Sequence, residues 1–139
     1  GKACEIAARN LEHNGRHMQA MRDRLQAGIT AAVADVRLNG HPESRLPNTL
    51  SLSFRNLEAN RLLEAIGMEV AASAGAACHA GSVAISHVLK AMAVPVEWAM
   101  GTLRLTTGRM TTAEEVDRAA QVIGEAANTL KGGNKNVRN

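Results

Sequence analysis

Two apolar stripes with helical spacing, one near each end of the sequence, restrict its fold most. In each stripe the apolar residues recur at intervals of three and four, which predicts a helix that buries one face. The stripes consist of Met18, Met21, Leu25, Ile29 and Val33, and of Val116, Ala120, Ile123, Ala127 and Leu130. A capping box, Thr112 to Glu115, marks the start of the second helix, and Gly132-Gly133 predicts its end. Both helices need a common surface to cover.

Short alternating segments between the two helices supply that surface. Thr49 to Phe54 and Thr102 to Thr106 place leucines on one face and polar residues on the other, as half-buried strands do. Further short strands are predicted at 35–38 and 68–72, a helix from Asn56 through Ile66, one from Ser86 and a short one from Pro95 to Gly101. We therefore expect a small α+β domain with a mostly antiparallel sheet, covered by helices on one side.

Composition and charge disfavour a nucleic-acid-binding or membrane-spanning protein. The 139 residues are 45% hydrophobic and 21% charged, with one Phe, one Trp and no Tyr. The net charge of +3 matches Lys131, Lys135 and Arg138 near the end, so a solvated basic tail is expected rather than a nucleic-acid-binding face. No apolar run is long enough to cross a membrane. We expect one domain over 1–131 and a flexible basic tail over 132–139.

Cys78 is the first candidate for chemistry. It lies in the run 73–82, where every residue except His79 is small. A segment this small is expected to form a mobile loop that exposes the thiol, which acts as a nucleophile only as the thiolate. A buried, inert thiol is the alternative. The five histidines and two cysteines show no metal-ligand spacing, so no metal site is predicted.

Arg104 is the second candidate. It occupies the middle of the predicted strand 102–106, on the face opposite Leu103 and Leu105. Its planar fork of donors suits the carboxylate of a substrate, although an exposed arginine paired with a neighbouring acid would also fit the pattern. His79 is a possible proton donor, but neighbouring side chains in an extended segment point apart, which disfavours a Cys78–His79 pair.

Several motifs in a fixed order resemble the cysteine desulfurases and selenocysteine lyases of the class V aminotransferase-like family. The motifs are Leu46-Pro47-Asn48-Thr49 with Leu52-Ser53-Phe54, the run 73–78, Ser86-His87-Val88-Leu89, and Leu103-Arg104-Leu105-Thr106-Thr107-Gly108-Arg109. They run almost from end to end of the chain. The resemblance implies the small C-terminal domain of a fold-type I pyridoxal-phosphate enzyme. Because the chain opens at Gly1 inside a predicted helix, we expect an N-terminal part to precede it.

The same resemblance implies roles for individual residues. Cys78 matches the cysteine that takes sulfur or selenium from L-cysteine or L-selenocysteine, leaving L-alanine, and Arg104 matches the arginine that holds the substrate carboxylate. The family's cofactor lysine has no match here, so no cofactor-binding residue is expected in this chain and the chain alone should be inactive. Full-length relatives are expected to be cytoplasmic or mitochondrial homodimers that use pyridoxal phosphate and pass sulfur or selenium to an acceptor protein.

Two other functions stay open at this point. The chain could be a non-catalytic module for dimerisation or partner docking, with Cys78 as a bystander. It could also be a carrier that accepts a persulfide on Cys78. The preference between cysteine and selenocysteine is not decided, because the run 75–79 is closer to selenocysteine lyases while the spacing from Cys78 to Leu89 is closer to bacterial and mitochondrial desulfurases.

Overall fold

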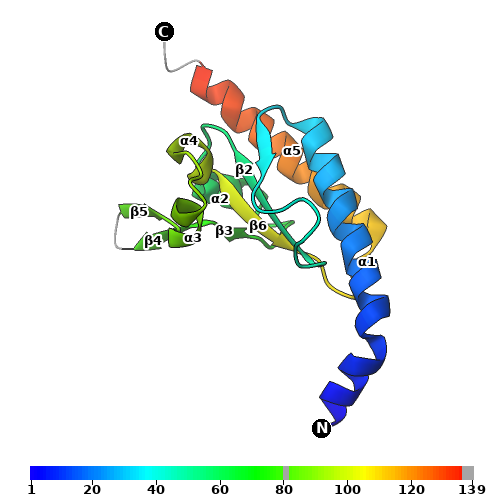
Figure 1. Cartoon of the computed structure of the whole chain (residues 1–139). Helices are drawn as coiled ribbons and strands as arrows, with labels where there is room; N and C mark the ends of the chain where they lie inside the picture. Colours follow the sequence, from blue (N-terminus) through cyan, green and yellow to red (C-terminus); the bar gives the residue numbers. More distant parts are fainter. Residues whose placement is uncertain (80–81, 136–139) are drawn as a thin grey trace.

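The computed structural model describes the backbone of residues 1–79 and 82–135, and their side chains except those of 76–79, 82–84 and 134–135. Helices and strands alternate irregularly along the chain (Figure 1). Their bounds are α1 (Lys2–Ala32), β1 (Val36–Leu38), β2 (Thr49–Phe54), α2 (Ala59–Ile66), β3 (Ser73–Ala74), β4 (Ala76–His79), β5 (Ser82–Ile85), α3 (His87–Ala91), α4 (Val96–Ala99), β6 (Thr102–Thr106) and α5 (Ala113–Lys135).

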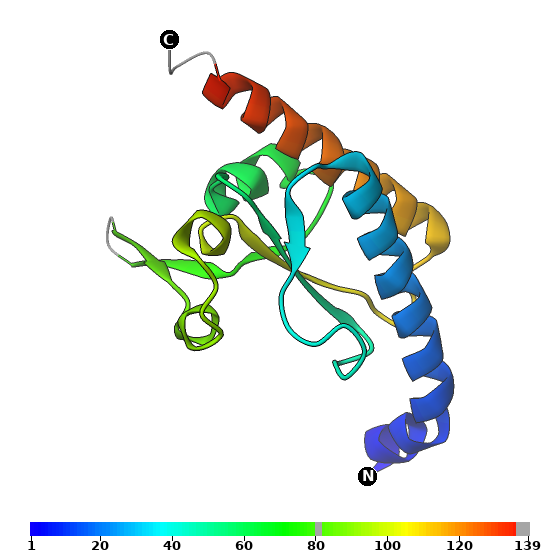
Figure 2. The same cartoon turned by 45° about the horizontal axis from the view of Figure 1, so that its top comes forward.

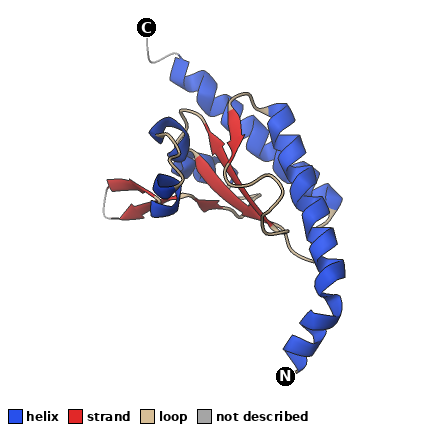
Figure 3. Ribbon diagram, viewed as in Figure 1, coloured by secondary structure: helices blue, strands red, loops and turns tan. Residues whose placement is uncertain are grey.

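A four-stranded antiparallel sheet in the order β1-β2-β6-β3 forms the centre of the fold (Figure 3). The register sets Leu50 opposite Leu105 and Leu52 opposite Leu103. These leucines therefore share one face of the sheet, where none is more than 3% exposed. The long helices α1 and α5 lie side by side against the sheet, with α2 beside them (Figures 1 and 2). The predicted α+β domain with an antiparallel sheet is confirmed.

Small residues let α1 and α5 approach closely. A Cβ atom placed on Gly28 of α1 would lie 2.8 Å from the Cβ of Ala120, and one on Gly124 of α5 would lie 2.9 Å from the Cβ of Ala32. Each glycine thus faces an alanine of the other helix. The predicted stripes are confirmed as the core faces of these helices, except that Met18 is half-buried outside the core cluster.

Two predicted boundaries near the second helix are wrong. Asn56 does not cap that helix: its φ is +57°, its N–H donates to the Glu97 carbonyl, and α2 begins three residues later. The predicted strand over 68–72 is absent, and the strand begins at Ser73 instead. The N–H groups of Glu69 and Val70 both donate to the Ile66 carbonyl, so this stretch closes α2 instead of entering the sheet.

Two other helices differ from the prediction, α5 in its end and α4 in its position. Helix α5 continues through Gly132 and Gly133 to Lys135, because a glycine weakens a helix without requiring it to end. The short helix α4 does not join the long helices: the Trp98 carbonyl accepts from Thr102 Oγ1 on the sheet's other face, so only one end of that face is covered. No helix in the described residues is long and apolar enough to span a membrane.

Candidate functional site

Arg104 lies on the open face of the sheet, in its central region. Strand β6 pairs with β2 and β3, so Arg104 stands between Ser51 on one side and Ser73 on the other. Its neighbours Leu103 and Leu105 are buried on the opposite face, while Arg104 itself is exposed. Among the described side chains no acid lies within ion-pair distance of its guanidinium. The strand therefore presents an unpaired cation from a fixed backbone.

Buried polar side chains support this face beside Arg104. Asn39 Nδ2 donates to Ser53 Oγ at 2.8 Å, and Ser53 Oγ lies 2.7 Å from Thr102 Oγ1. Asn39 Nδ2 also reaches Ser51 Oγ at 3.3 Å. Buried hydrogen bonds of this kind fix local geometry. They tie β2, β6 and the residue after β1 together, one row of residues away from Arg104.

The backbone that carries Cys78 leaves the same sheet. Ser73 of β3 is paired with Arg104, and two residues later the Gly75 N–H donates to the Thr102 carbonyl at 2.7 Å. A Cβ on Gly75 would lie 2.6 Å from Thr102 Cγ2, so only glycine allows this approach. Strand β4 begins immediately afterwards, and Cys78 lies opposite Val83 of β5.

The segment around Cys78 is therefore a hairpin of two short strands, where the sequence predicted a loop. Small side chains do not prevent β pairing, because the ladder is built from backbone groups. The side chains of Cys78 and His79 lie outside the described residues, so the roles expected for them stay predictions. The structure brings the backbone of Cys78 and the strand of Arg104 into one connected unit.

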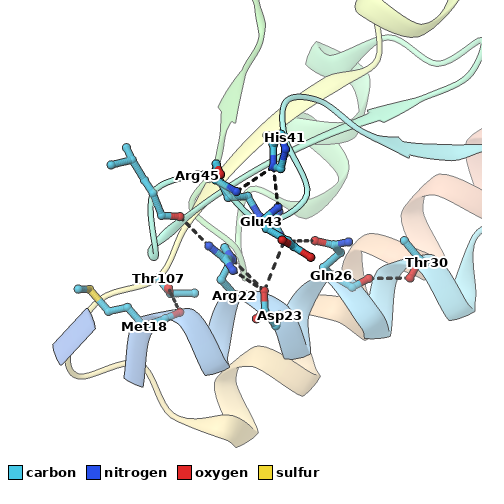
Figure 4. Close-up of polar contacts among 11 residues, drawn as sticks. Met18, Arg22, Asp23, Gln26, Thr30, His41, Glu43, Arg45 and Thr107 are labelled. Atoms are coloured by element: carbon cyan, nitrogen blue, oxygen red, sulfur yellow. Dashed lines mark hydrogen bonds and ion pairs between the residues drawn. The ribbon is translucent and has the colours of Figure 1, made fainter. Parts of the chain in front are cut away.

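A pair of arginines, Arg22 and Arg45, which sequence reasoning missed, fastens the 39–48 segment to α1. Arg22 is only 3% exposed; its Nη1 donates to the Leu46 carbonyl at 2.7 Å, and its Nε and Nη2 reach Asp23. Arg45 Nη2 bonds Gln26 at 2.8 Å and also approaches Asp23 (Figure 4). Burial, and then the charge of Arg22, lowers the pKa of Arg45.

This anchoring leaves some polar atoms unsatisfied. Arg45 Nε and Nη1 and Asn39 Oδ1 are buried without a hydrogen-bond partner. Arg22 lies outside the predicted apolar stripe of the first helix, and charged residues are rarely buried. Its burial depends on the Leu46 carbonyl, which comes from a loop 24 residues further along the chain. No local pattern signals such a contact.

Three of the four lysines of the chain have side chains in the described part of the structure. Lys2 is exposed near the start of α1 and pairs with Glu5. Lys90 is exposed on α3, and Lys131 bonds the Ala34 carbonyl. No group of three metal-ligating side chains occurs in the part that the structure describes.

Comparison with known proteins places this fold in a family. The chain resembles a solved NifS-like protein with a TM-score of 0.78 and 31% identity, over 93% of this chain and 32% of that one. The model of the family described as "Aminotransferase class-V" matches residues 1–119. The chain belongs to this class V aminotransferase family.

The most similar curated relatives include cysteine desulfurases. The chain is 40% identical over 124 residues to "Cysteine desulfurase NifS" of Azotobacter vinelandii, covering 88% of this chain and 31% of that protein. It is also 40% identical over 132 residues to "Cysteine desulfurase IscS" of Methanosarcina thermophila, covering 94% and 32% respectively. The chain thus spans about a third of the length of the curated relatives it matches.

Proposed function

We propose that this chain is the C-terminal part of a longer cysteine desulfurase that converts L-cysteine to L-alanine and retains the sulfur on Cys78. The observation that carries the proposal is the unpaired Arg104 on the open sheet face, on the strand that pairs with β3, from which the Cys78 hairpin departs. The similarity to cysteine desulfurases supports the choice of substrate.

Arg104 would bind and orient the substrate. An amino acid presents one carboxylate, and a guanidinium with no competing acid can donate two parallel hydrogen bonds to it. The backbone of Arg104 is held by strands on both sides, so the bound carboxylate has a fixed position. Such positioning lets one reacting group reach another without a further loss of orientational freedom.

Cys78 would take the sulfur. Its thiolate attacks the substrate sulfur, the new S–S bond forms as the carbon–sulfur bond breaks, and the carbon receives the electron pair and then a proton to give alanine. Pyridoxal phosphate, when held by the remainder of the full-length protein, would supply the electron sink that this bond cleavage needs. The residues of this chain do not supply its lysine.

The test measures alanine release by the full-length protein from L-cysteine with excess dithiothreitol. Cys78→Ser should abolish release, because a hydroxyl is a far weaker nucleophile toward sulfur. Arg104→Gln should lower kcat/KM about a hundredfold, chiefly through KM, if hydrogen bonds to a charged group contribute about 3 kcal/mol. Arg109→Gln, at an exposed arginine outside the sheet, is the matched control. Undiminished release from Cys78→Ser would overturn the proposal.

Selenocysteine is proposed as a second substrate, measured in the same assay. A selenocysteine-specific enzyme would release alanine from L-selenocysteine and none from L-cysteine. The 139-residue chain alone should release no alanine and should show no visible absorption from a lysine-bound pyridoxal phosphate. The full-length protein is proposed to be a cytoplasmic homodimer. Sedimentation tests the oligomeric state, and a monomer would contradict the proposed homodimer.

The other two functions remain as alternatives with distinct outcomes. A non-catalytic docking module leaves alanine release unchanged when Cys78 is replaced. A persulfide carrier gains sulfur on Cys78 from a separate sulfur donor, in the isolated chain and without releasing alanine.

A further inference from the structure

The segment that follows the Cys78 hairpin forms a small core of its own with an apolar outer surface. Leu89, Val94 and Ala99 of the α3–α4 region are buried together, with Ile85 and Trp98 packed against them. The outward side chains of the same region are apolar as well. Val88, Met92 and Val96 are 53%, 42% and 61% exposed. Exposed apolar groups gathered in one short segment are typical of a binding surface.

Two arginines meet the edge of this segment at the only tryptophan of the chain. The guanidinium carbons of Arg37 and Arg55 lie 5.9 Å and 5.8 Å from the centre of the Trp98 ring. A cation near an aromatic face is attracted to it, but two cations at one ring repel each other. Neither arginine forms an ion pair with a described acid, including the nearby Glu97.

Several other arginines of the chain are paired with acids, unlike Arg37 and Arg55. Arg24 makes two hydrogen bonds to the carboxylate of Asp117, and Arg118 makes two to Glu69. The pair at Trp98 is therefore a local excess of positive charge beside apolar groups. Tryptophan, arginine and methionine are also the residues that are enriched at protein–protein contact centres. An acidic surface with apolar side chains would complement both properties.

The surface of α3 and α4 lies next to the hairpin that carries Cys78. Strand β5 pairs with the strand of Cys78, and Ile85 at its end contacts the core of α3 and α4. Only Ser86 separates β5 from α3, and its Oγ accepts from the Val88 N–H. A protein bound across α3 and α4 would thus lie next to the hairpin that carries Cys78.

We propose that the Trp98 patch, formed by Arg37, Arg55, Trp98, Val88, Met92 and Val96, docks an acidic protein surface that carries a thiol and takes the sulfur from Cys78. This inference rests on the proposed function. The acceptor thiolate attacks the outer sulfur of the Cys78 persulfide. A new S–S bond forms on the acceptor while the bond to Cys78 breaks, and Cys78 leaves as a thiolate.

The first test measures binding to the 139-residue chain through the fluorescence of Trp98, its sole tryptophan. The probes are two synthetic helical peptides, each with a single cysteine. The glutamate peptide consists otherwise of leucine and glutamate, and the lysine peptide of leucine and lysine. The glutamate peptide should bind at least about tenfold more tightly at low salt, and the difference should shrink as salt is added. Equal binding of both peptides overturns the proposal.

Matched double variants locate the contact. Arg37→Gln with Arg55→Gln should remove the preference for the glutamate peptide. Arg9→Gln with Arg16→Gln removes the same charge from the exposed start of α1 and should preserve it. A preference that survives in the first double variant assigns the binding to another surface and contradicts the proposal.

The second test follows sulfur transfer from the full-length protein, with the glutamate peptide and dithiothreitol as acceptors at equal thiol concentration. Arg37→Gln with Arg55→Gln should slow transfer to the peptide about tenfold and leave the dithiothreitol rate unchanged. An equal fall in both rates shows that the two arginines act on sulfur release from Cys78 in general and not on docking, which also overturns the inference. Absence of alanine release in the unsubstituted protein instead refutes the proposed function, while the fluorescence test still decides the docking surface.

Discussion

Gly28→Ala is predicted to destabilise the protein, although alanine is the better helix former. In an open helix position the change stabilises by about 1 kcal/mol. At position 28 the new Cβ would lie 2.8 Å from the Cβ of Ala120, whereas non-bonded carbons prefer about 3.5–4.0 Å. Both atoms are attached directly to helix backbones, so relief requires α1 and α5 to move apart. Overpacking of this kind costs about 1–3 kcal/mol, which leaves a net loss of about 1 kcal/mol.

Two further variants isolate the cause. Gly15→Ala places a Cβ in the same helix with nothing within 4 Å, so it should stabilise by up to about 1 kcal/mol. Combining Gly28→Ala with Ala120→Gly exchanges the two residues across the interface. Propensities then cancel and the clash disappears, so the double variant should lie close to the unsubstituted protein, with a non-additive energy of about 2 kcal/mol.

Urea unfolding followed by circular dichroism measures these free energies. The denaturant slope should stay constant, since the surface exposed on unfolding barely changes. Stabilisation by Gly28→Ala equal to that by Gly15→Ala would refute the reasoning about close helix approach. Additive effects of Gly28→Ala and Ala120→Gly would refute it as well.

The remaining predictions concern single contacts and use the same unfolding assay. Arg22→Met should lower the free energy of unfolding by about 3 kcal/mol, because it removes a buried, hydrogen-bonded charge. Arg45→Met should lower it by less than about 1 kcal/mol, because the buried Nε and Nη1 of Arg45 have no partner to lose. Equal losses in the two variants would contradict this. Thr112→Ala should cost about 1 kcal/mol by removing a helix cap, and no loss would contradict it. The hydrogen bond from Arg24 lowers the pKa of Asp117 below its usual 3.8, so its stabilisation is present above that pH and is lost as the pH falls through the lowered value. Arg24→Gln should therefore reduce the acid sensitivity of unfolding, measured between roughly pH 5 and pH 2, and an unchanged acid profile would count against it.

The sequence predicts the elements whose signal is local. The stripes of α1 and α5 and the alternation of β2 and β6 depend on residues a few positions apart. Each element is found where it was expected, although α5 continues past its predicted end. The exposure of Arg104 follows from the same alternation. The capping box at Thr112 is likewise formed as predicted, with hydrogen bonds in both directions.

The misplaced elements depend on distant partners. The turn at Asn56 is fixed by the Glu97 carbonyl and β3 by its pairing with β6, and neither contact is visible in a local window. Burial of Arg22 has the same origin. The pairing of Cys78 with Val83 was missed because a run of small residues carries neither a strand pattern nor a helix pattern.

The most direct measurement of the central claim is the location of the sulfur. Full-length protein incubated briefly with L-cysteine, without a reducing acceptor, is digested and its cysteine peptides are weighed by mass spectrometry. The account predicts the added mass of one sulfur atom on the peptide that contains Cys78, and its loss in Arg104→Gln at substrate concentrations below the raised KM. Sulfur on the peptide of Cys4, or on neither peptide while alanine is released, would contradict it.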